Sequence, residues 1–118
     1  MIILSYNCRG LASPHKKLSI KRMISLLGPQ IIFLQETMGS RDVVKRMLES
    51  CLSGWSFEAV DAVGRSGGVA IGWRPALTRC ENLWGFHGAL GMKIYCWDLD
   101  KVFMVVNIYG PYQERLVF

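Results

Sequence analysis

The sequence predicts an α/β domain in which a mixed β-sheet carries helices on one face. Two apolar runs, "MIILSY" at 1–6 and "IIFLQ" at 31–35, are typical of strands buried on both faces. Amphipathic segments with helical spacing follow each of them. After Gly54 the chain becomes rich in aromatic and β-branched residues, in segments broken by Gly, Pro or Asp, which indicates a run of strands.

The first strand is expected over residues 1–6 because three apolar residues are consecutive there. A helix is expected over residues 15–27, where apolar side chains fall broadly on one face and basic ones mostly on the other. The apolar set is Leu18, Met23, Ile24, Leu26 and Leu27, and the basic set is Lys16, Lys17, Lys21 and Arg22. Gly28 and Pro29 end this helix.

The second strand covers "IIFLQ", and a second helix is expected over residues 41–52 with Ser40 as its cap. A strand–helix–strand unit implies a parallel pair with a right-handed crossover. The later segments imply antiparallel meanders, and "DLDK" at 98–101 is typical of a tight hairpin turn. No repeat or linker divides the chain, so residues 1–118 are expected to form one domain.

Composition narrows the class of protein. Hydrophobic residues make up 51% of the 118 and charged ones 19%, which excludes a disordered tail. The formal charge of +5 favours polyanionic partners such as nucleic acid. The basic face at 16–22 is by itself more typical of a solvated helix surface than of a nucleic-acid reader. No apolar stretch is long enough to span a bilayer, so no membrane partner is expected.

The four cysteines, at positions 8, 51, 80 and 96, form no Cys-x-x-Cys pair, and the two histidines are not at zinc-ligand spacing. Reduced thiols in an intracellular protein are the expectation, either nuclear or cytoplasmic.

Four segments carry a family resemblance. "SYNCRGL", "FLQET", "SGGVAIGW" and "NIYGPY" occur in this order, each at the end or in the middle of an expected strand. Together they resemble the endonuclease/exonuclease/phosphatase superfamily, which has the DNase-I-like fold, and in particular the apurinic-type endonuclease domain of plant non-LTR (LINE-type) retrotransposons. The resemblance implies that the chain is the N-terminal half of a four-layer α/β sandwich.

The resemblance also implies roles for three residues. Asn7 would be the active-site asparagine beside the metal and the scissile phosphate, and Glu36 would be the metal-binding carboxylate. Tyr109 would direct its hydroxyl at the phosphate. These residue types suit the chemistry, because Mg²⁺ (or Mn²⁺) prefers carboxylate oxygen, and amide and phenol groups supply hydrogen bonds without adding negative charge.

Each of these residues also has a plainer interpretation. Asn7 could be a turn residue after a strand, Glu36 a solvent-facing loop acid, and Tyr109 an ordinary strand aromatic. Gln35 is interpreted as the last residue of its strand rather than as part of the site.

Five further positions near these segments are given no catalytic role. Gly67 and Gly68 are interpreted as glycines that allow close backbone packing before a strand. Cys8 and Arg9 are not catalytic types in the family, and Arg9 is at most a surface phosphate contact. Tyr6 stands where many relatives carry Trp, a difference that concerns packing.

The family's later motifs lie beyond the "YGP" segment: an acid–asparagine pair in a "GDFN"-type turn, and an aspartate–histidine pair near the carboxyl terminus. In this sequence no Asp follows Asp100 and no His follows His87. A truncated domain is therefore expected, with weak Mg²⁺ binding and negligible turnover. The missing half is also expected to supply the second sheet, which would leave one sheet face uncovered and open to self-association.

Three functions remain open at this stage. The first is a metal-dependent phosphodiesterase lineage acting on nucleic acid, DNA rather than RNA, and inactive as a fragment. The second is a non-catalytic fragment that binds nucleic acid or a protein. The third is a phosphatase-type relative acting on small-molecule or lipid phosphoesters.

Overall fold

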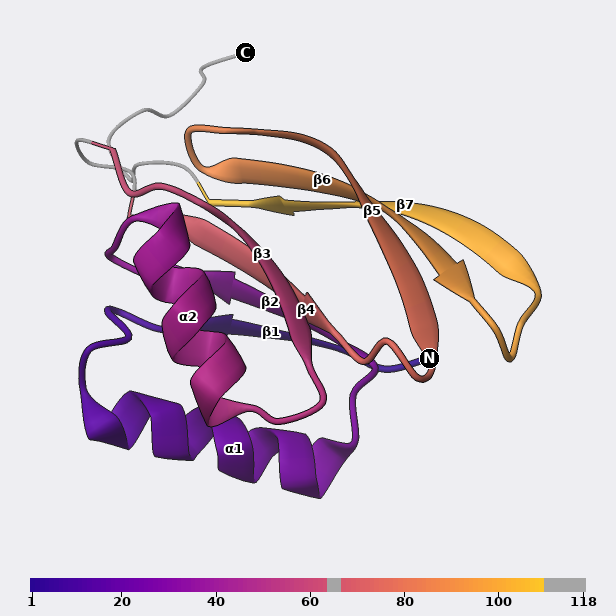
Figure 1. Cartoon of the computed structure of the whole chain (residues 1–118), viewed down its shortest axis with the longest axis horizontal. Coiled ribbons are helices and arrows are strands. Elements are labelled where there is room, and N and C mark those ends of the chain that lie inside the picture. The colour runs from indigo at the N-terminus through magenta and orange to yellow at the C-terminus, as the bar shows by residue number, and fades with distance from the viewer. Residues whose placement is uncertain (64–66, 110–118) are drawn as a thin grey trace, which may run out of the picture.

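A computed structural model describes residues 1–63 and 67–109 of the chain (Figure 1). Two helices and seven strands follow one another in these residues. They are β1 (Ile3–Asn7), α1 (Pro14–Leu27), β2 (Ile31–Gln35), α2 (Arg41–Cys51), β3 (Ser56–Val60), β4 (Val69–Trp73), β5 (Thr78–Phe86), β6 (Ala89–Cys96) and β7 (Lys101–Ile108). Both expected helices and the first two strands lie where the sequence predicts them, with ends shifted by one or two residues.

The strands form two sheets rather than one. The first has the order β1-β2-β4-β3, with β1 parallel to β2 and the other neighbours antiparallel, so it is the predicted mixed sheet. The second is an antiparallel meander of β5, β6 and β7. The expected hairpin turn connects β6 to β7, and its Asp100 adopts a left-handed φ of 47°.

Three layers result, with both helices on the side of the first sheet that faces away from the second (Figure 1). One core cluster lies between helices and sheet, where Ile20 and Leu48 meet Leu34 and Phe57. The other lies between the two sheets. It joins Ile31, Val69 and Ile71 of the first sheet to Leu90, Met92 and Ile94 of the second.

The expectation of an uncovered sheet face is wrong for the first sheet. On the face that was expected to be uncovered, Val69 and Ile71 are fully buried, and Trp55 and Phe57 are buried on the opposite face, beneath the helices. The reason is that three strands of the second sheet are present in this chain and cover that face.

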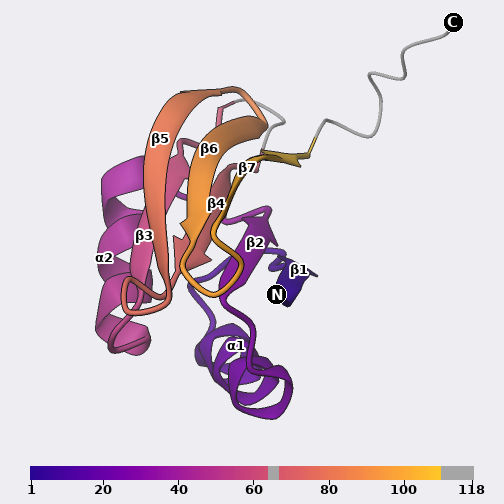
Figure 2. The ribbon, with the colours of Figure 1, turned by 90° about the vertical axis from the view of Figure 1, so that its right-hand side faces the viewer.

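Exposed apolar surface lies instead along the outward row of β7, at Val102, Met104, Val106 and Ile108. The sandwich is also open along one flank: β1 and β7, the edge strands of the two sheets, lie on the same side, away from β3 and β5 (Figure 2). An apolar groove of about 360 Å³ lies there, between Met1 and Ile3 on one side and Phe103 and Met104 on the other.

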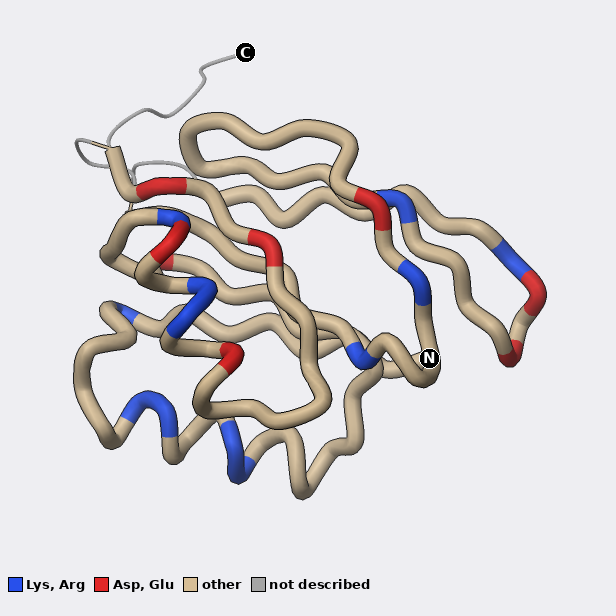
Figure 3. The backbone as a smooth tube through the Cα atoms, in the orientation of Figure 1, with Lys and Arg blue, Asp and Glu red and all other residues tan. Residues whose placement is uncertain are grey.

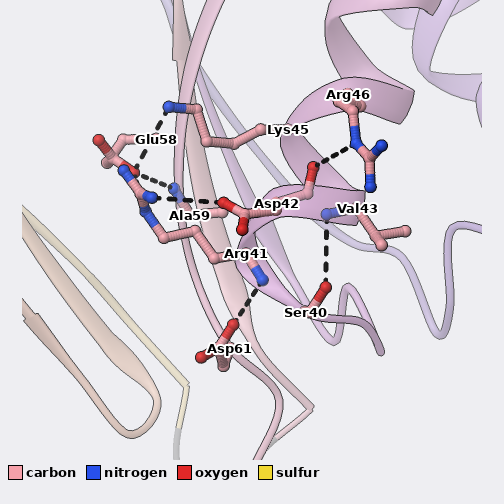
Figure 4. A network of polar contacts seen from close by, with 9 residues as sticks. All are labelled: Ser40, Arg41, Asp42, Val43, Lys45, Arg46, Glu58, Ala59 and Asp61. Carbon is pink, nitrogen blue, oxygen red and sulfur yellow. Dashed lines mark hydrogen bonds and ion pairs between the residues drawn. The ribbon is translucent and has the colours of Figure 1, made fainter.

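A polar network fixes the start of α2 to β3 (Figure 4). Ser40 caps the helix by accepting a hydrogen bond from the Val43 amide, as predicted. The Arg41 guanidinium donates to Glu58 over 2.8 Å, and Lys45 lies 3.9 Å from the same carboxylate. Burial alone would raise the pKa of Glu58, but these cations and the Ala59 amide hold it below its usual range.

Two sequence expectations concern the chain as a whole. No helix within the described residues has the length and apolarity needed to cross a membrane. All four cysteines are free thiols.

Candidate functional site

The predicted site residues gather where β1, β2 and β7 end. Asn7 and Gln35 are paired last residues of the parallel strands β1 and β2, and Glu36 follows directly. Tyr109 follows β7, and its hydroxyl donates a hydrogen bond of 2.7 Å to Oε1 of Glu36. Residues distant by 73 positions in the sequence therefore meet at one edge of the sandwich. The structure brings Asn7, Glu36 and Tyr109 together, while their chemical roles remain predictions.

The backbone around Glu36 is tightly constrained. Glu36 has a left-handed φ of 52°, an uncommon conformation for a residue with a side chain. Its carbonyl accepts from the Gly10 amide at 2.8 Å, and the next residue, Thr37, donates to the Gly68 carbonyl at 3.3 Å. A Cβ atom at Gly67 would lie 3.0 Å from the Glu36 Cα. The prediction that Gly67 and Gly68 serve close backbone packing is confirmed, and what they pack against is the Glu36 segment.

The sequence left two interpretations of Asn7, a turn residue or a member of the site. In the structure it holds a turn and also lies at the same sheet edge as Glu36. The Asn7 Oδ1 accepts a hydrogen bond of 3.1 Å from the Arg9 amide, which holds a turn in which Arg9 has a φ of 49°. The hydrogen bond to Glu36 raises the pKa of Tyr109 by favouring the protonated phenol. Burial and the charge of Glu36 act in the same direction, whereas the Asn7 amide and the charge of Arg9 oppose them.

Two further polar residues lie directly behind the site. Gln35 donates to Ser5 Oγ at 3.0 Å and to Asn107 Oδ1 at 2.9 Å. Asn107 was not singled out from the sequence, and Gln35 was interpreted only as a strand end. The signal for Asn107 is its place in the inward row of β7, because Phe103, Val105 and Tyr109 share that row and pack between the sheets.

Cys8 is excluded as a nucleophile. It is buried, and burial raises the pKa of its thiol to about 12, partly offset by Lys16 and reinforced by Glu36. A thiol with this pKa is protonated at neutral pH, which removes its reactivity.

Positively charged residues are spaced along α1 (Figure 3). The helix carries Lys16, Lys17, Lys21 and Arg22 and no acidic residue. The ion pairs within residues 1–63 and 67–109 involve Arg41, Lys45 and Arg79, and none involves these four cations.

The donor set suits a hydrated Mg²⁺ better than a fully protein-ligated metal. Tyr109 uses Oε1 of Glu36, while no hydrogen bond within the described residues reaches Oε2. No group of three or more His, Cys, Asp or Glu side chains gathers in this part of the chain. One carboxylate with a nearby amide matches an ion that keeps most of its waters and binds substrate phosphate as well.

Comparison with known proteins identifies the family and supports the DNase-I-like fold expected from the sequence. The sequence profile described as the Endonuclease/Exonuclease/phosphatase family matches residues 4–103. No curated protein sequence gives a significant match. The structure is similar to the AP endonuclease LMAP from Leishmania major, with a TM-score of 0.65 and 18% identity over 91% of this chain and 39% of that one.

Two other solved structures are similar to the same extent. The endonuclease domain of TRAS1, a telomere-specific non-LTR retrotransposon, gives a TM-score of 0.66 and 14% identity over 96% of this chain and 47% of that one. ANGEL2, a 2′,3′-cyclic phosphatase, gives a TM-score of 0.62 and 15% identity over 94% of this chain and 41% of that one. The chain thus spans less than half the length of these neighbours, and the DNase-I-like fold is confirmed. Because the family profile covers most of its sequence, the chain belongs to the endonuclease/exonuclease/phosphatase family.

Proposed function

We propose that this chain supplies the metal- and phosphate-facing part of a phosphodiesterase site that acts on nucleic acid. The observation that carries the proposal is the hydrogen bond from Tyr109 to Glu36, formed beside Asn7 at the meeting point of β1, β2 and β7. A carboxylate, an amide and a phenol converge here from the ends of three strands. Apolar side chains already pack the space between the two sheets, so packing alone does not account for these polar groups.

The chemistry of the proposed site divides among these residues. Glu36 would hold Mg²⁺ through the carboxylate oxygen that Tyr109 leaves free. The ion would neutralise charge on the phosphoryl oxygens and lower the pKa of a bound water. Asn7 would orient the phosphate by donating from its amide nitrogen, which adds no negative charge. The Tyr109 hydroxyl, whose single proton is donated to Glu36, would hold the metal-binding carboxylate in place. A phenol is already protonated at neutral pH, and the hydrogen bond to Glu36 raises the pKa of Tyr109 further.

The basic side chains of α1, none of which forms an ion pair within the described residues, favour nucleic acid over a small phosphoester. Four cations on one helix, without acidic neighbours on that helix, can contact successive phosphates of a polyanion. A small-molecule phosphoester would engage the Glu36 site without needing them.

We expect low turnover from residues 1–118 alone. Within the described residues, no group of three or more His, Cys, Asp and Glu side chains surrounds Glu36, so few groups are available to move the proton of the attacking water. The basic side chains of α1 also support the second candidate function, a module that binds nucleic acid without cleaving it.

The test combines cleavage with binding. Purified chain is incubated with supercoiled plasmid, an abasic-site duplex, single-stranded RNA and bis-p-nitrophenyl phosphate, each with Mg²⁺ or Mn²⁺. Glu36→Ala is compared with Glu49→Ala, which removes an exposed acid on α2. Slow cleavage that is lost in Glu36→Ala and retained in Glu49→Ala supports the proposal.

The other outcomes discriminate among the alternatives. Salt-dependent retardation of DNA without cleavage, unchanged in Glu36→Ala, favours the binding module. Cleavage of bis-p-nitrophenyl phosphate with no retention of nucleic acid favours a small-molecule phosphatase. Cleavage that survives in Glu36→Ala contradicts the assignment of the site.

A further inference from the structure

Asn107 is a buried polar residue with a complete set of hydrogen bonds. It lies in the inward row of β7 and is only 1% exposed. Its Nδ2 donates to the carbonyl of Leu34 at 3.1 Å and to the carbonyl of Ala70 at 2.8 Å. Its Oδ1 accepts from Gln35 Nε2 at 2.9 Å. Both acceptors are carbonyl oxygens, so the orientation of the amide is fixed by its neighbours.

Packing alone does not explain an asparagine here. Elsewhere the two sheets meet through apolar side chains such as Ile71, Leu90 and Met92. An amide buried among such groups is unfavourable unless each of its polar atoms has a partner. Directional hydrogen bonds differ from apolar contacts in one useful way, because they fix the register of one element on another.

The three hydrogen-bond partners of Asn107 lie close in the sequence to residues of the candidate site or to the glycines packed against it. Leu34 and Gln35 immediately precede Glu36, and Ala70 lies in β4, which follows the glycines packed against the Glu36 segment. On β7, Asn107 is two residues before Tyr109, so the two side chains point to the same face of the chain. Gln35 continues the connection to Ser5 of β1, the strand that ends on Asn7.

We propose that Asn107 is a positioning residue that sets β7 on β2 and β4 so that the Tyr109 hydroxyl meets the Glu36 carboxylate. Its importance for catalysis rests on the proposed function. The positioning itself does not, because it concerns a contact within this chain.

The ionisation of Tyr109 reports this contact directly. The hydrogen bond to Glu36 raises the pKa of Tyr109, so loss of the contact lowers the titration midpoint. The experiment follows the ring carbon signals of ¹³C-labelled tyrosine by NMR as pH increases. Tyr109→Phe assigns the signal, and Glu36→Gln gives the midpoint expected when the negative partner is absent.

The test variant is Asn107→Leu, and the matched control is Thr78→Val. Thr78 is also 1% exposed in the second sheet, and its hydroxyl donates to the Arg74 carbonyl at 3.1 Å. It pairs with Cys96, at the opposite end of β6 from Leu90, the partner of Asn107. Asn107→Leu loses three hydrogen bonds and Thr78→Val loses one, and both variants are expected to melt at lower temperature. Only Asn107→Leu is expected to move the Tyr109 midpoint down toward that of Glu36→Gln.

A folded Asn107→Leu protein whose Tyr109 titrates as in the wild type would overturn the proposal, as would an equal shift in Thr78→Val. If Asn107→Leu does not fold, Gln35→Met and Asn107→Ser decide the matter. Each removes only part of the network, so each is expected to give a smaller shift in the same direction, and no shift in either overturns the proposal. If Tyr109 shifts as expected but Glu36→Gln leaves Mn²⁺ affinity unchanged, the proposed function fails while the positioning role stands.

Discussion

At the scale of single residues, Glu36 and its neighbours show how sequence position and backbone strain combine. The family resemblance gave Asn7 and Glu36 roles in one site, and the two residues lie at the same edge of the first sheet. The resemblance contained no information on the left-handed φ of Glu36 or on the glycines that support it. Those features depend on β4, which approaches from a distant part of the sequence and packs against the Glu36 segment.

Gly67→Ala should disturb the site through the backbone. The new methyl group would lie 2.9 Å from the Met38 sulfur and 3.0 Å from the Glu36 Cα, so the Glu36 segment must shift. We expect a loss of about 1–3 kcal/mol in the free energy of unfolding, typical of overpacking. We also expect an affinity for Mn²⁺ at least about tenfold lower, by calorimetric titration.

The control for this variant is Gly54→Ala. Gly54 has a φ of 81° with no atom within 4 Å of an added Cβ, so alanine there strains the backbone without touching Glu36. An equal loss of Mn²⁺ affinity in both variants would show that the effect is general destabilisation.

At the scale of elements, local patterns identified the helices and the first parallel pair. Apolar spacing and a Ser40 cap are properties of adjacent residues, and α2 begins where they predict. The division into two sheets was missed because β4 and β6 are both apolar on two faces, and that pattern does not say which strands pair. Asn107 was missed for a related reason, since its partners are 37 to 73 positions away.

The contact between α2 and β3 should make stability depend on pH. The pKa of Glu58 is held below its usual value of 4.5 in the folded protein. Its stabilising effect is therefore complete above about pH 4.5 and is lost as pH falls through the folded pKa. Glu58→Gln should lower the free energy of unfolding by about 1 kcal/mol at pH 7, since its partner Arg41 is half-exposed.

Urea denaturation at pH 7 and at pH 3 measures this effect. The difference between wild type and Glu58→Gln should shrink at the lower pH. Glu49→Gln, which removes an exposed acid on α2, should change the free energy of unfolding little at either pH. A Glu58→Gln deficit that is undiminished at pH 3 would mean that the ion pair is not its cause.

At the scale of the whole molecule, the sandwich leaves the outward row of β7 exposed. Met104 is 71% exposed and Ile108 is 70% exposed, and β7 is an edge strand within the described residues. Exposed apolar edge strands promote association between chains. We therefore predict that the isolated chain binds a hydrophobic dye and self-associates at high concentration.

Met104→Lys should reduce both effects, because a charge on an edge strand opposes pairing. The control is Ser25→Lys, which adds the same charge at an exposed position on α1. Light scattering and dye fluorescence are the measurements. A dye-silent, monodisperse wild-type chain, or an equal response in Ser25→Lys, would contradict this account of the β7 surface.

The most direct measurement of the central claim is where Mn²⁺ binds. In an NMR spectrum of the ¹⁵N-labelled chain, substoichiometric Mn²⁺ broadens the amide signals of residues near the ion. The account predicts selective broadening around Asn7, Glu36 and Tyr109, its loss in Glu36→Gln, and its retention in Glu49→Gln. Broadening centred elsewhere, or unchanged in Glu36→Gln, would contradict the claim that these three residues form a metal–phosphate site.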